Sequence, residues 1–399
     1  MTDSKKHTLH AMALEACYWM GNCAYGAYVV TMLTDCGYSA ATASALMTFV
    51  AVVSFIVQPL TGYLCDNFFP QRSVFMLLVG CSIPLYLLFN SSMQSLPLTI
   101  LCMFMLTLCM QQLPGLVDSW ILRMQKDDPN INYGLCRGTA SLMYATASLI
   151  MGSVTTAYGH HARMIIGACM SVLAVLVAFT IKGHRPASKA EKSGEKPAPA
   201  KHMSTLETFK VMSQNKTYML VLLMAFAIWL GSSCTSTFLP TLVKELGGDS
   251  GLVGTAFSII AYSEVPAMFL TSRILRRFKT KNVVLFACAA YVLRMGMTCL
   301  APNLTVLLLM QPLQGISYAI LWPTCITYVN QIVEERVKST SVMTFTSVTL
   351  GISGIFANAI GTAILSATGN VRMVFLYATC AVSVGLLIAV YGRLRKLWK

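Results

Sequence analysis

Long apolar stretches, separated by short polar segments, run along the whole chain. An α-helix needs about 20 predominantly apolar residues to cross a bilayer, and the stretches divide into twelve segments of that kind. Their expected limits are 11–34, 40–63, 73–90, 97–120, 133–157, 161–182, 217–241, 251–272, 282–301, 304–330, 338–364 and 370–392. The pattern therefore predicts an all-α membrane protein with twelve transmembrane helices.

One polar segment is much longer than the others and divides the chain into two parts. It is rich in Pro, Lys and Ser and too polar to be buried, so we expect a mobile cytoplasmic linker that ends in a surface helix. This predicts a six-helix half over 1–182, a linker over 183–216 and a second six-helix half over 217–399. Runs of small residues in the fifth and eleventh helices support two equivalent halves, although small residues are also consistent with any tight helix bundle.

Composition and charge support this class. Of 399 residues, 56% are hydrophobic and 11% are charged, whereas soluble domains carry about 25% charged residues. The net charge of +14 would suggest nucleic-acid binding if the 29 Lys and Arg residues were gathered together. Most of them instead lie on one side of the predicted helices, which the positive-inside rule makes cytoplasmic. Both termini are therefore expected inside, and no nucleic-acid partner is expected.

Sequence features of enzymes and metal sites are missing. The 14 cysteines are scattered singly and form no C-x-x-C pair, which argues against a zinc site or a disulfide framework. Neither a Walker A sequence nor an H-E-x-x-H sequence occurs, and the short connections leave no room for a catalytic domain. We therefore expect neither an enzyme nor a cofactor or metal. The first apolar stretch lacks a small-residue cleavage site and is interpreted as a retained helix.

Three consecutive predicted helices, the eighth to the tenth, each carry one polar group within an apolar stretch. These groups are Glu264, Arg294 and Gln314. Ionisable residues inside the membrane usually face the protein interior, occur in pairs and mark a path for a substrate or an ion. The depths of Glu264 and Arg294 differ by about 6 Å at 1.5 Å per residue, so long side chains can meet. The alternative is a purely structural ion pair.

A second candidate ion pair joins the fourth and fifth helices. Asp118 lies near the end of the fourth helix, and Arg137 opens the fifth. Tyr144 follows Arg137 by two helical turns, so it places an aromatic surface on the same face. Asp118 could instead cap its helix or contact the interface, and Tyr144 could be ordinary packing.

Polar residues at helical spacing also mark one face of the first helix. Tyr18, Asn22 and Tyr25 could line a cavity or could make interhelical hydrogen bonds, and the pattern leaves both interpretations open. Glu15 lies close to the predicted cytoplasmic boundary, where a carboxylate can reach water. We therefore expect Glu15 at the interface.

The segment QPLTGYLCDNFFPQR at 58–72 resembles the G-x-L-x-D-x-x-x-x-R signature of the major facilitator superfamily. Gly62, Asp66 and Arg72 occupy the expected turn between the second and third helices. The resemblance implies that Gly62 permits close packing and that Asp66 and Arg72 latch the cytoplasmic side. Phe69 stands where a Gly is common, and the Arg is displaced by one residue, so the role of Asp66 is the safer one.

Further motifs resemble the lactose-permease type of proton symporter and its oligosaccharide, nucleoside and phenylpropionate relatives, over nearly the whole chain. They are QPLTGYLCD at 58–66, Gly26-Ala27-Tyr28, the aromatic-Gly-x-x-Arg run at 133–137, and Lys281-Asn282 leading to Arg294. The resemblance implies that Arg137 binds a sugar, that Asp118 pairs with it and that Tyr144 stacks on the sugar. It also assigns Glu264 and Arg294 to the proton and substrate machinery.

The departures from that pattern restrict the resemblance to the broader permease group. Gln314 stands where the lactose permease has a His, and Ser317 stands where it has its proton-carrying Glu. The predicted seventh and eleventh helices also lack the Asp and Lys expected of a lactose carrier.

The expected function is proton-coupled symport of a small polar solute, such as an oligosaccharide, glycoside or nucleoside, by alternating access. Asn22, Tyr25, Asp118, Arg137, Tyr144, Arg294 and Gln314 are the candidate solute-binding residues. Glu264 or Asp118 would carry the proton, the coupling ion. We expect a monomer in the inner membrane. Uptake of an organic acid and proton-antiport efflux are the alternatives, although the fifth helix lacks the Gly-Pro motif of antiporters.

Overall fold

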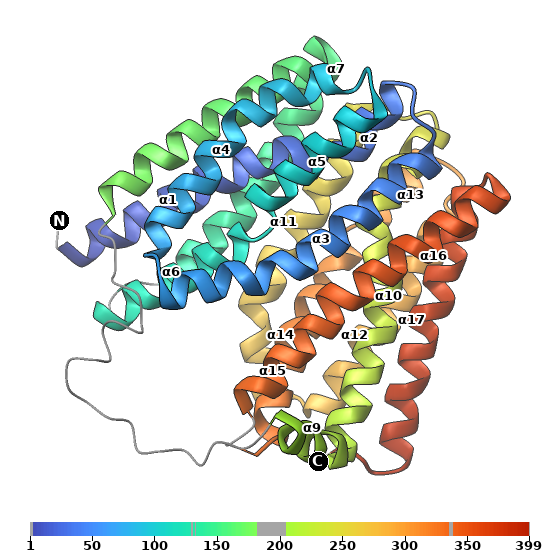
Figure 1. Cartoon of the computed structure of the whole chain (residues 1–399). Helices are drawn as coiled ribbons and strands as arrows, with labels where there is room; N and C mark the ends of the chain where they lie inside the picture. Colours follow the sequence, from blue (N-terminus) through green and yellow to red (C-terminus); the bar gives the residue numbers. More distant parts are fainter. Residues whose placement is uncertain (1–2, 129–130, 132, 182–204, 335–337, 399) are drawn as a thin grey trace. The chain divides into compact units, whose positions relative to one another are not determined.

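The structure, a computed structural model, describes residues 3–128, 131, 133–181, 205–334 and 338–398. Within these ranges the chain forms helices and no strand (Figure 1). Ten of the described helices are long and apolar enough to cross a membrane. The predicted all-α membrane class is therefore confirmed.

The helices of the first half of the chain correspond to the predicted ones, except that the first begins at Asp3 instead of residue 11 and that two predicted helices are broken. The observed helices are α1 (Asp3–Gly26), α2 (Val29–Asp35), α3 (Ala40–Asn67), α4 (Gln71–Ser92), α5 (Leu96–Met110), α6 (Leu113–Asp127) and α7 (Tyr133–Thr180). The predicted first helix is divided between α1 and α2, and the predicted fourth between α5 and α6. α7 covers the fifth and sixth predicted helices and turns at Gly159, whose φ of 79° suits glycine.

The second half begins with α9 (Thr205–Gln214), which lies where a surface helix was expected; the linker residues 183–204 are outside the described part of the chain. The helices that follow are α10 (Lys216–Glu245), α11 (Ser250–Arg277), α12 (Thr280–Leu300), α13 (Leu304–Met310), α14 (Leu313–Ile332), α15 (Lys338–Thr346), η3 (Ser347–Ile352), α16 (Ser353–Thr368) and α17 (Val371–Leu394). The predicted tenth helix is broken between α13 and α14. The predicted eleventh contains the π-helical turn η3.

The helices gather into two compact units. Unit 1 comprises residues 1–39, 49–196 and 249–258, and unit 2 comprises 40–48, 197–248 and 259–399. In unit 1, α1 packs along α7, and α4 packs against α5 and α7. In unit 2, α17 packs against α10 and α12, and α12 packs against α14. Each unit thus has its own helical core, and the first turns of α11 belong to unit 1.

The turn expected over 62–72 is shorter than predicted. α3 continues to Asn67, and α4 begins at Gln71, so Gly62 and Asp66 are helical rather than part of the turn. Pro70 explains where the break falls, because a proline disfavours helical conformation in the residue before it.

Candidate functional site

A buried guanidinium lies at the centre of the polar contacts of unit 2. Arg294 of α12 is 1% exposed. Its terminal nitrogens donate hydrogen bonds to the side-chain oxygens of Gln314 and, at 3.1 Å, of Gln311. The amide nitrogen of Gln314 donates to Oε1 of Glu264 at 2.9 Å. The structure thus brings Glu264 and Arg294 together with Gln314 as the link, and it adds Gln311, which the sequence pattern did not single out.

A glycine sets the distance between the helices that carry Glu264 and Gln314. The N–H of Gly315 donates to Oγ of Ser263 at 3.1 Å, and a Cβ on Gly315 would overlap the backbone of Ser263. Only a residue without a side chain permits this approach of α14 to α11. Because Ser263 and Gly315 are sequence neighbours of Glu264 and Gln314, this contact holds the carboxylate and the amide at the same level.

The helix break beside Gln314 has a counterpart in unit 1. Gln311 and Pro312 separate α13 from α14, and Gln111 and Gln112 separate α5 from α6. The surrounding residues read MQPLQG in unit 2 and MQQLPG in unit 1. Interrupted hydrophobic helices at corresponding positions of two halves point to a binding site in transporters. The repeat is visible in the sequence, but it lay inside two stretches that were each predicted to be continuous.

Aromatic rings cluster near Arg294. The ring centroid of Trp229 in α10 lies 5.3 Å from that of Trp322 and 6.2 Å from that of Tyr318, both on α14. Tyr291, one turn before Arg294 on α12, lies 6.4 Å from Trp229. The sequence pattern did not single out these residues, because aromatic residues in apolar helices are more often core than ligand contacts. Their side chains combine large apolar surfaces with polar tips.

In unit 1, Asp118 of α6 and Arg137 of α7 lie beside each other, as the sequence predicts. Oδ1 of Asp118 is 4.0 Å from Nε of Arg137, and the two side chains are 34% and 37% exposed. The hydroxyl of Tyr133 donates to Oδ1 of Asp118 at 3.1 Å, and Arg137 donates to Oγ of Ser141 at 3.5 Å. The ion pair is loose and partly open to water.

The indole of Trp19 joins this pair to α1. The guanidinium of Arg137 lies 5.3 Å from the centroid of the Trp19 ring, and Tyr144 packs edge-on against the same ring at 5.8 Å. The indole nitrogen donates to Oε2 of Glu15 at 2.9 Å. The aromatic ring over Arg137 is therefore that of Trp19, and Tyr144 supports it. Trp19 lies one helical turn after Glu15, a spacing that could have drawn attention to it.

The expected interfacial position of Glu15 is wrong. Glu15 is 1% exposed. α1 begins at Asp3 rather than near residue 11, so Glu15 lies well inside the helix and not at its end. α1 packs along α7, and Asp118 of α6 and Cys136 of α7 lie near Glu15.

The polar face predicted on α1 divides between two environments. Asn22 donates to the hydroxyl of Tyr18 at 3.4 Å, and that hydroxyl donates to the carbonyl of Met110 at 3.5 Å. Tyr25 is 4% exposed and packs edge-on against Phe89 of α4 at 5.3 Å. The Tyr18 contact with Met110 of α5 is an interhelical hydrogen bond, the alternative that the sequence left open, whereas Asn22 bonds within α1 and Tyr25 packs through its ring.

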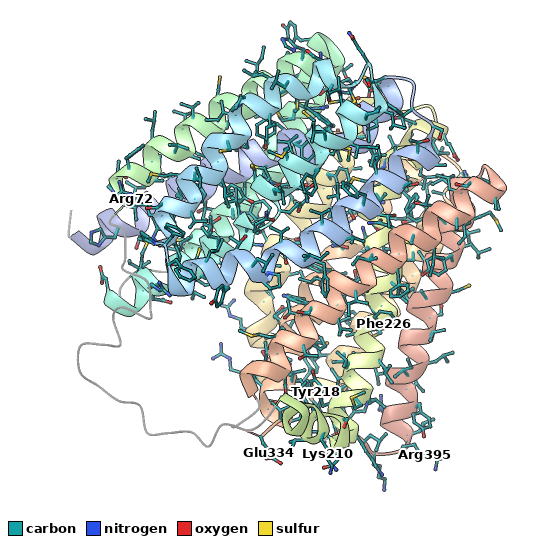
Figure 2. The ribbon with its side chains drawn as sticks, in the orientation of Figure 1. Arg72, Lys210, Tyr218, Phe226, Glu334 and Arg395 are labelled. Atoms are coloured by element: carbon teal, nitrogen blue, oxygen red, sulfur yellow. The ribbon has the colours of Figure 1, made fainter. Side chains whose placement is uncertain are left out.

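The three residues expected to gate the cytoplasmic side lie at the ends of α3 and α4. A Cβ on Gly62 would meet no described atom within 4 Å, so no close approach there requires glycine. The side chain of Asp66 is outside the described part of the structure. Arg72, labelled in Figure 2, donates to the carbonyl of Phe179 at 3.1 Å in the last turn of α7, where a cation is favoured by the helix dipole.

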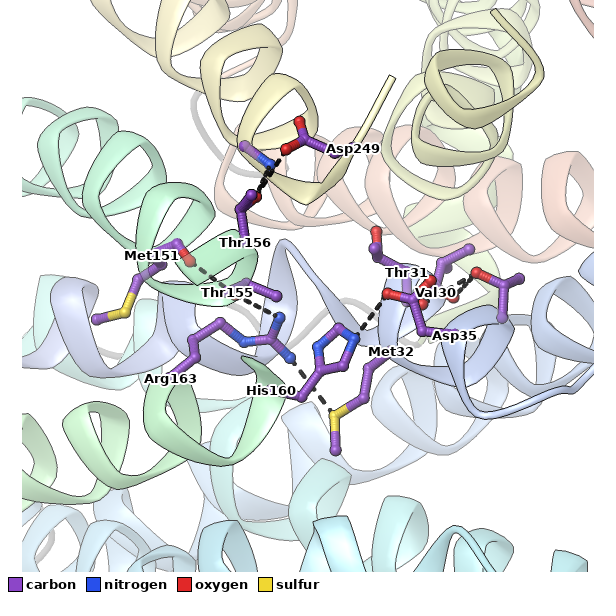
Figure 3. A network of polar contacts seen from close by, with 12 residues as sticks. Val30, Thr31, Met32, Asp35, Met151, Thr155, Thr156, His160, Arg163 and Asp249 are labelled. Atoms are coloured by element: carbon purple, nitrogen blue, oxygen red, sulfur yellow. Dashed lines mark hydrogen bonds and ion pairs between the residues drawn. The ribbon is translucent and has the colours of Figure 1, made fainter. Parts of the chain in front are cut away.

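A second polar network lies at the end of unit 1 that the charge pattern places outside (Figure 3). Arg163 of α7 is fully buried. Its guanidinium donates to Oγ1 of Thr155 at 3.1 Å and lies 4.7 Å from the ring centroid of Tyr28. Nε2 of His160 is 2.7 Å from Oδ2 of Asp35. The sequence pattern did not single out Arg163, which stands close to the start of the predicted sixth helix.

The start of α11 packs against α7 beside this network. Thr156 donates to Oδ2 of Asp249 at 2.8 Å, and Ser148 donates to the carbonyl of Gly254 at 3.2 Å. A Cβ on Gly254 would overlap the Tyr28 hydroxyl and the Ser148 carbonyl. The Tyr28 hydroxyl in turn donates to the Ser148 carbonyl. This glycine contact and these hydrogen bonds hold the first turns of α11 on α7.

Titratable side chains elsewhere in the described ranges do not gather as a metal site: no group of three His, Cys, Asp or Glu residues has suitable geometry there. A cavity of about 590 Å³ lies between α9, α10 and α15, and Lys210 and Tyr218, labelled in Figure 2, line it. Apart from Lys210 its lining carries no charged group, and no residue of the clusters around Arg294, Arg137 and Arg163 lines it.

Comparison with known proteins gives a consistent picture. The family described as the MFS_1 like family matches residues 13–377. The chain is 26% identical to the maltose permease of Geobacillus stearothermophilus over 348 residues. The matched region covers 86% of this chain and 83% of the permease. It is 24% identical to the uncharacterized transporter YwbF of Bacillus subtilis (strain 168) over 318 residues. This matched region covers 79% of this chain and 76% of YwbF.

Solved transporter structures have a similar fold. The nucleoside transporter NupG matches with a TM-score of 0.74 and 16% identity, over 96% of this chain and 98% of that chain. A D-xylose-proton symporter matches with a TM-score of 0.70 and 15% identity, over 98% of this chain and 96% of that chain. At these identities the likeness concerns the fold alone.

Proposed function

Since this multi-pass membrane transporter belongs to the MFS_1 like family, we propose that it is a proton-coupled symporter that takes up a small polar organic solute by alternating access. The solute is an oligosaccharide, a glycoside or a nucleoside. A relative named for maltose supports the sugar class, and solved structures named for nucleosides and D-xylose share the fold. Arginines beside aromatic rings also support these classes, because a planar guanidinium can donate two hydrogen bonds to neighbouring oxygens.

Twelve helices cross the bilayer in this proposal, with both termini in the cytoplasm. Ten described helices meet the length and hydropathy needed. One of them is α7, whose 48 residues turn at Gly159. It would measure about 72 Å if straight, more than twice the hydrocarbon thickness of about 30 Å, and therefore supplies two spans. α1 with α2 supplies the remaining span.

The observation that carries the proposal is the chain of hydrogen bonds from Arg294 through Gln314 to Glu264. Glu264 is the proton carrier, and Arg294 and Gln314 contact the solute. A proton on Glu264 removes the negative charge that attracts the Gln314 amide, which frees Gln314 and Arg294 for the solute. Proton binding and solute binding are then linked through one network, and the linkage is reciprocal. Within unit 1, Asp118, Arg137 and the Trp19 and Tyr144 rings are the proposed solute contacts.

Reconstituted liposomes test this proposal. The purified protein is screened with maltose, xylose, a nucleoside and an aryl carboxylate, with an inward proton gradient imposed. We expect uphill accumulation of a sugar or nucleoside that a protonophore abolishes. Glu264→Gln should retain counterflow exchange but lose accumulation. The exposed carboxylate Glu334, labelled in Figure 2, provides the matched control Glu334→Gln, which should behave as wild type.

Other outcomes would overturn parts of the proposal. Wild-type accumulation by Glu264→Gln would show that Glu264 does not carry the proton. Accumulation of the aryl carboxylate alone would change the solute class. Uptake driven by an outward proton gradient would replace symport with antiport.

A further inference from the structure

Glu15 is a buried carboxylate that the proposed transport cycle does not yet use. It is 1% exposed. Its Oε2 accepts a hydrogen bond from the Trp19 indole at 2.9 Å, whereas its Oε1 is buried and has no hydrogen-bond partner in the described residues. A buried ionised carboxylate needs several donors or a close cation to offset its lost hydration. One indole N–H is too little, so this position requires a compensating positive charge.

The nearest arginine is engaged elsewhere. Arg137 lies with its Nε 4.0 Å from Asp118 and its guanidinium 5.3 Å from the Trp19 ring centroid. Arg137 is near enough to Glu15 to act on it electrostatically, and the Trp19 indole contacts both residues. Asp118 and Arg137 are each about one-third exposed, whereas Glu15 is 1% exposed.

Charge in this part of unit 1 does not balance without a further cation. The titratable groups that face Glu15 from α1, α6 and α7 are Tyr18, Asp118, Tyr133, Cys136 and Arg137. Phenols and thiols are neutral near pH 7. Two carboxylates then share one guanidinium, which leaves the cluster one positive charge short when both are ionised. A proton is the only cation that one buried oxygen can bind without further ligands.

We propose that Glu15 is a proton-binding site and that its protonation state reaches Arg137 through the indole of Trp19. The inference rests on the proposed function and deepens it, because it places a second protonation site beside the solute contacts of unit 1. The proton binds Oε1 of Glu15 from water and returns to water, and no other bond forms or breaks. Asp118 remains the partner of Arg137. Glu15 is a positioning residue, which acts on Arg137 through the ring on which the guanidinium stacks.

Tryptophan fluorescence of the purified full-length protein tests this inference. Because Trp19 donates directly to Glu15, a change in the charge of Glu15 changes the environment of the indole. Titration between pH 5 and pH 9 should therefore give a fluorescence step that Trp19→Phe removes. Glu15→Gln keeps an oxygen for the indole to donate to but cannot ionise, so it should lose the step. Glu15→Asp retains an ionisable group and should restore a step at a different pH.

A further variant tests the neighbouring charge. Asp118→Asn removes a negative charge beside Glu15, so the step should move to lower pH by roughly one unit or less. Absence of the step in the wild type, or its persistence in Glu15→Gln, would overturn the assignment. The titration requires no solute. If the fluorescence step behaves as expected but proton-driven uptake fails, only the proposed symport is disproved. If uptake succeeds but the step is absent, only the role of Glu15 is disproved.

Discussion

The side-chain amide of Gln314 donates a 2.9 Å hydrogen bond to the carboxylate of Glu264. The oxygen of the same amide accepts from Arg294, which fixes the direction in which the amide points. The lactose-permease pattern has a His at this position, and an imidazole can bind and release a proton. An amide cannot do so near neutral pH. In the proposed mechanism, Gln314 therefore transmits a change in charge at Glu264 without carrying the proton itself.

Replacing the side-chain amide of Gln314 should uncouple the charge of Glu264 from that of Arg294. Gln314→Leu removes the acceptor of Arg294 and the donor to Glu264, and hydrogen bonds to charged groups contribute about 1.5–3 kcal/mol each. We expect the affinity for the solute identified by the screen to fall by roughly tenfold or more. Equilibrium binding to the purified variant measures the change.

The same helix provides the matched control for this substitution. Gln331→Leu makes the same change at an exposed position of α14 and should bind as wild type. Wild-type affinity in Gln314→Leu would exclude Gln314 from the site. An equal loss in both variants would indicate a general effect on α14.

Arginine 137 should not tolerate replacement by lysine. Arg137→Lys keeps the charge near Asp118 but removes the planar group that stacks on Trp19, and an ammonium is a compact point charge that cannot donate in a fork. We expect solute binding to fall by at least about tenfold. Arg393→Lys, at the exposed end of α17, is the control. Unchanged affinity in Arg137→Lys would place the solute elsewhere.

Helix positions could be predicted from the sequence because the bilayer sets their length. The breaks could not be predicted in the same way. Gln111 with Gln112, and Gln311 with Pro312, are interruptions of only two residues, so the average hydropathy around each pair still predicts one continuous helix. Comparing the two halves directly would have revealed MQQLPG and MQPLQG as a repeat.

The candidate site was predictable where a charge stood in an apolar stretch. Glu264, Arg294, Asp118 and Arg137 stand out because charged residues in the membrane are costly. Their connections depend on which helix faces meet, and a single sequence does not contain that information. Trp19 has no charge that distinguishes it in the sequence, and its role follows from the guanidinium of Arg137 that lies over its ring.

Glu15 and Arg163 illustrate a different limit. Both lie close to predicted helix ends, where charged residues usually reach water. The true extent of α1, and the turn at Gly159 in α7, bury both side chains. Small errors in helix limits are therefore enough to change a buried charge into an apparent surface charge.

The pH dependence of transport should not arise from Asp249. The backbone N–H of Leu252, with the Thr156 hydroxyl, donates to this carboxylate and lowers its pKa below the usual value of 3.8. A lowered pKa means that the ionised form stabilises the start of α11 fully above pH 3.8, and this stabilisation is lost only as the pH falls through the lowered pKa. Asp249→Asn should therefore leave the shape of the transport profile between pH 5 and pH 8 unchanged.

Thermal stability provides the second measurement for Asp249→Asn. The variant should have a slightly lower Tm than the wild type at pH 7, and the difference should narrow in acid as the wild-type carboxylate becomes protonated. A shift of the transport profile in this variant would show that Asp249 titrates within the working range.

Glycine 254 should control the contact between α7 and the start of α11. A methyl group at this position would overlap the Tyr28 hydroxyl and the Ser148 carbonyl. Packing an extra carbon into a close contact costs about 1–3 kcal/mol and forces the elements apart. In Gly254→Ala we therefore expect α11 to separate from α7, and we expect the labelling rate of Ser250→Cys by a membrane-impermeant thiol reagent to rise by roughly tenfold or more. Ser250 is 8% exposed, so labelling starts from a low rate.

A second glycine separates this steric effect from a general effect of adding a methyl group. Gly80 lies inside α4, and a Cβ there would meet no described atom within 4 Å. Gly80→Ala should therefore leave the labelling of Ser250→Cys unchanged and should stabilise α4 slightly, by up to about 1 kcal/mol. Native thiols are exposed as well, so labelling is counted above that of the chain without the Ser250→Cys change. If Gly254→Ala labelled no faster than Gly80→Ala, the contact of Gly254 with Tyr28 and Ser148 would not be what keeps the start of α11 closed against α7.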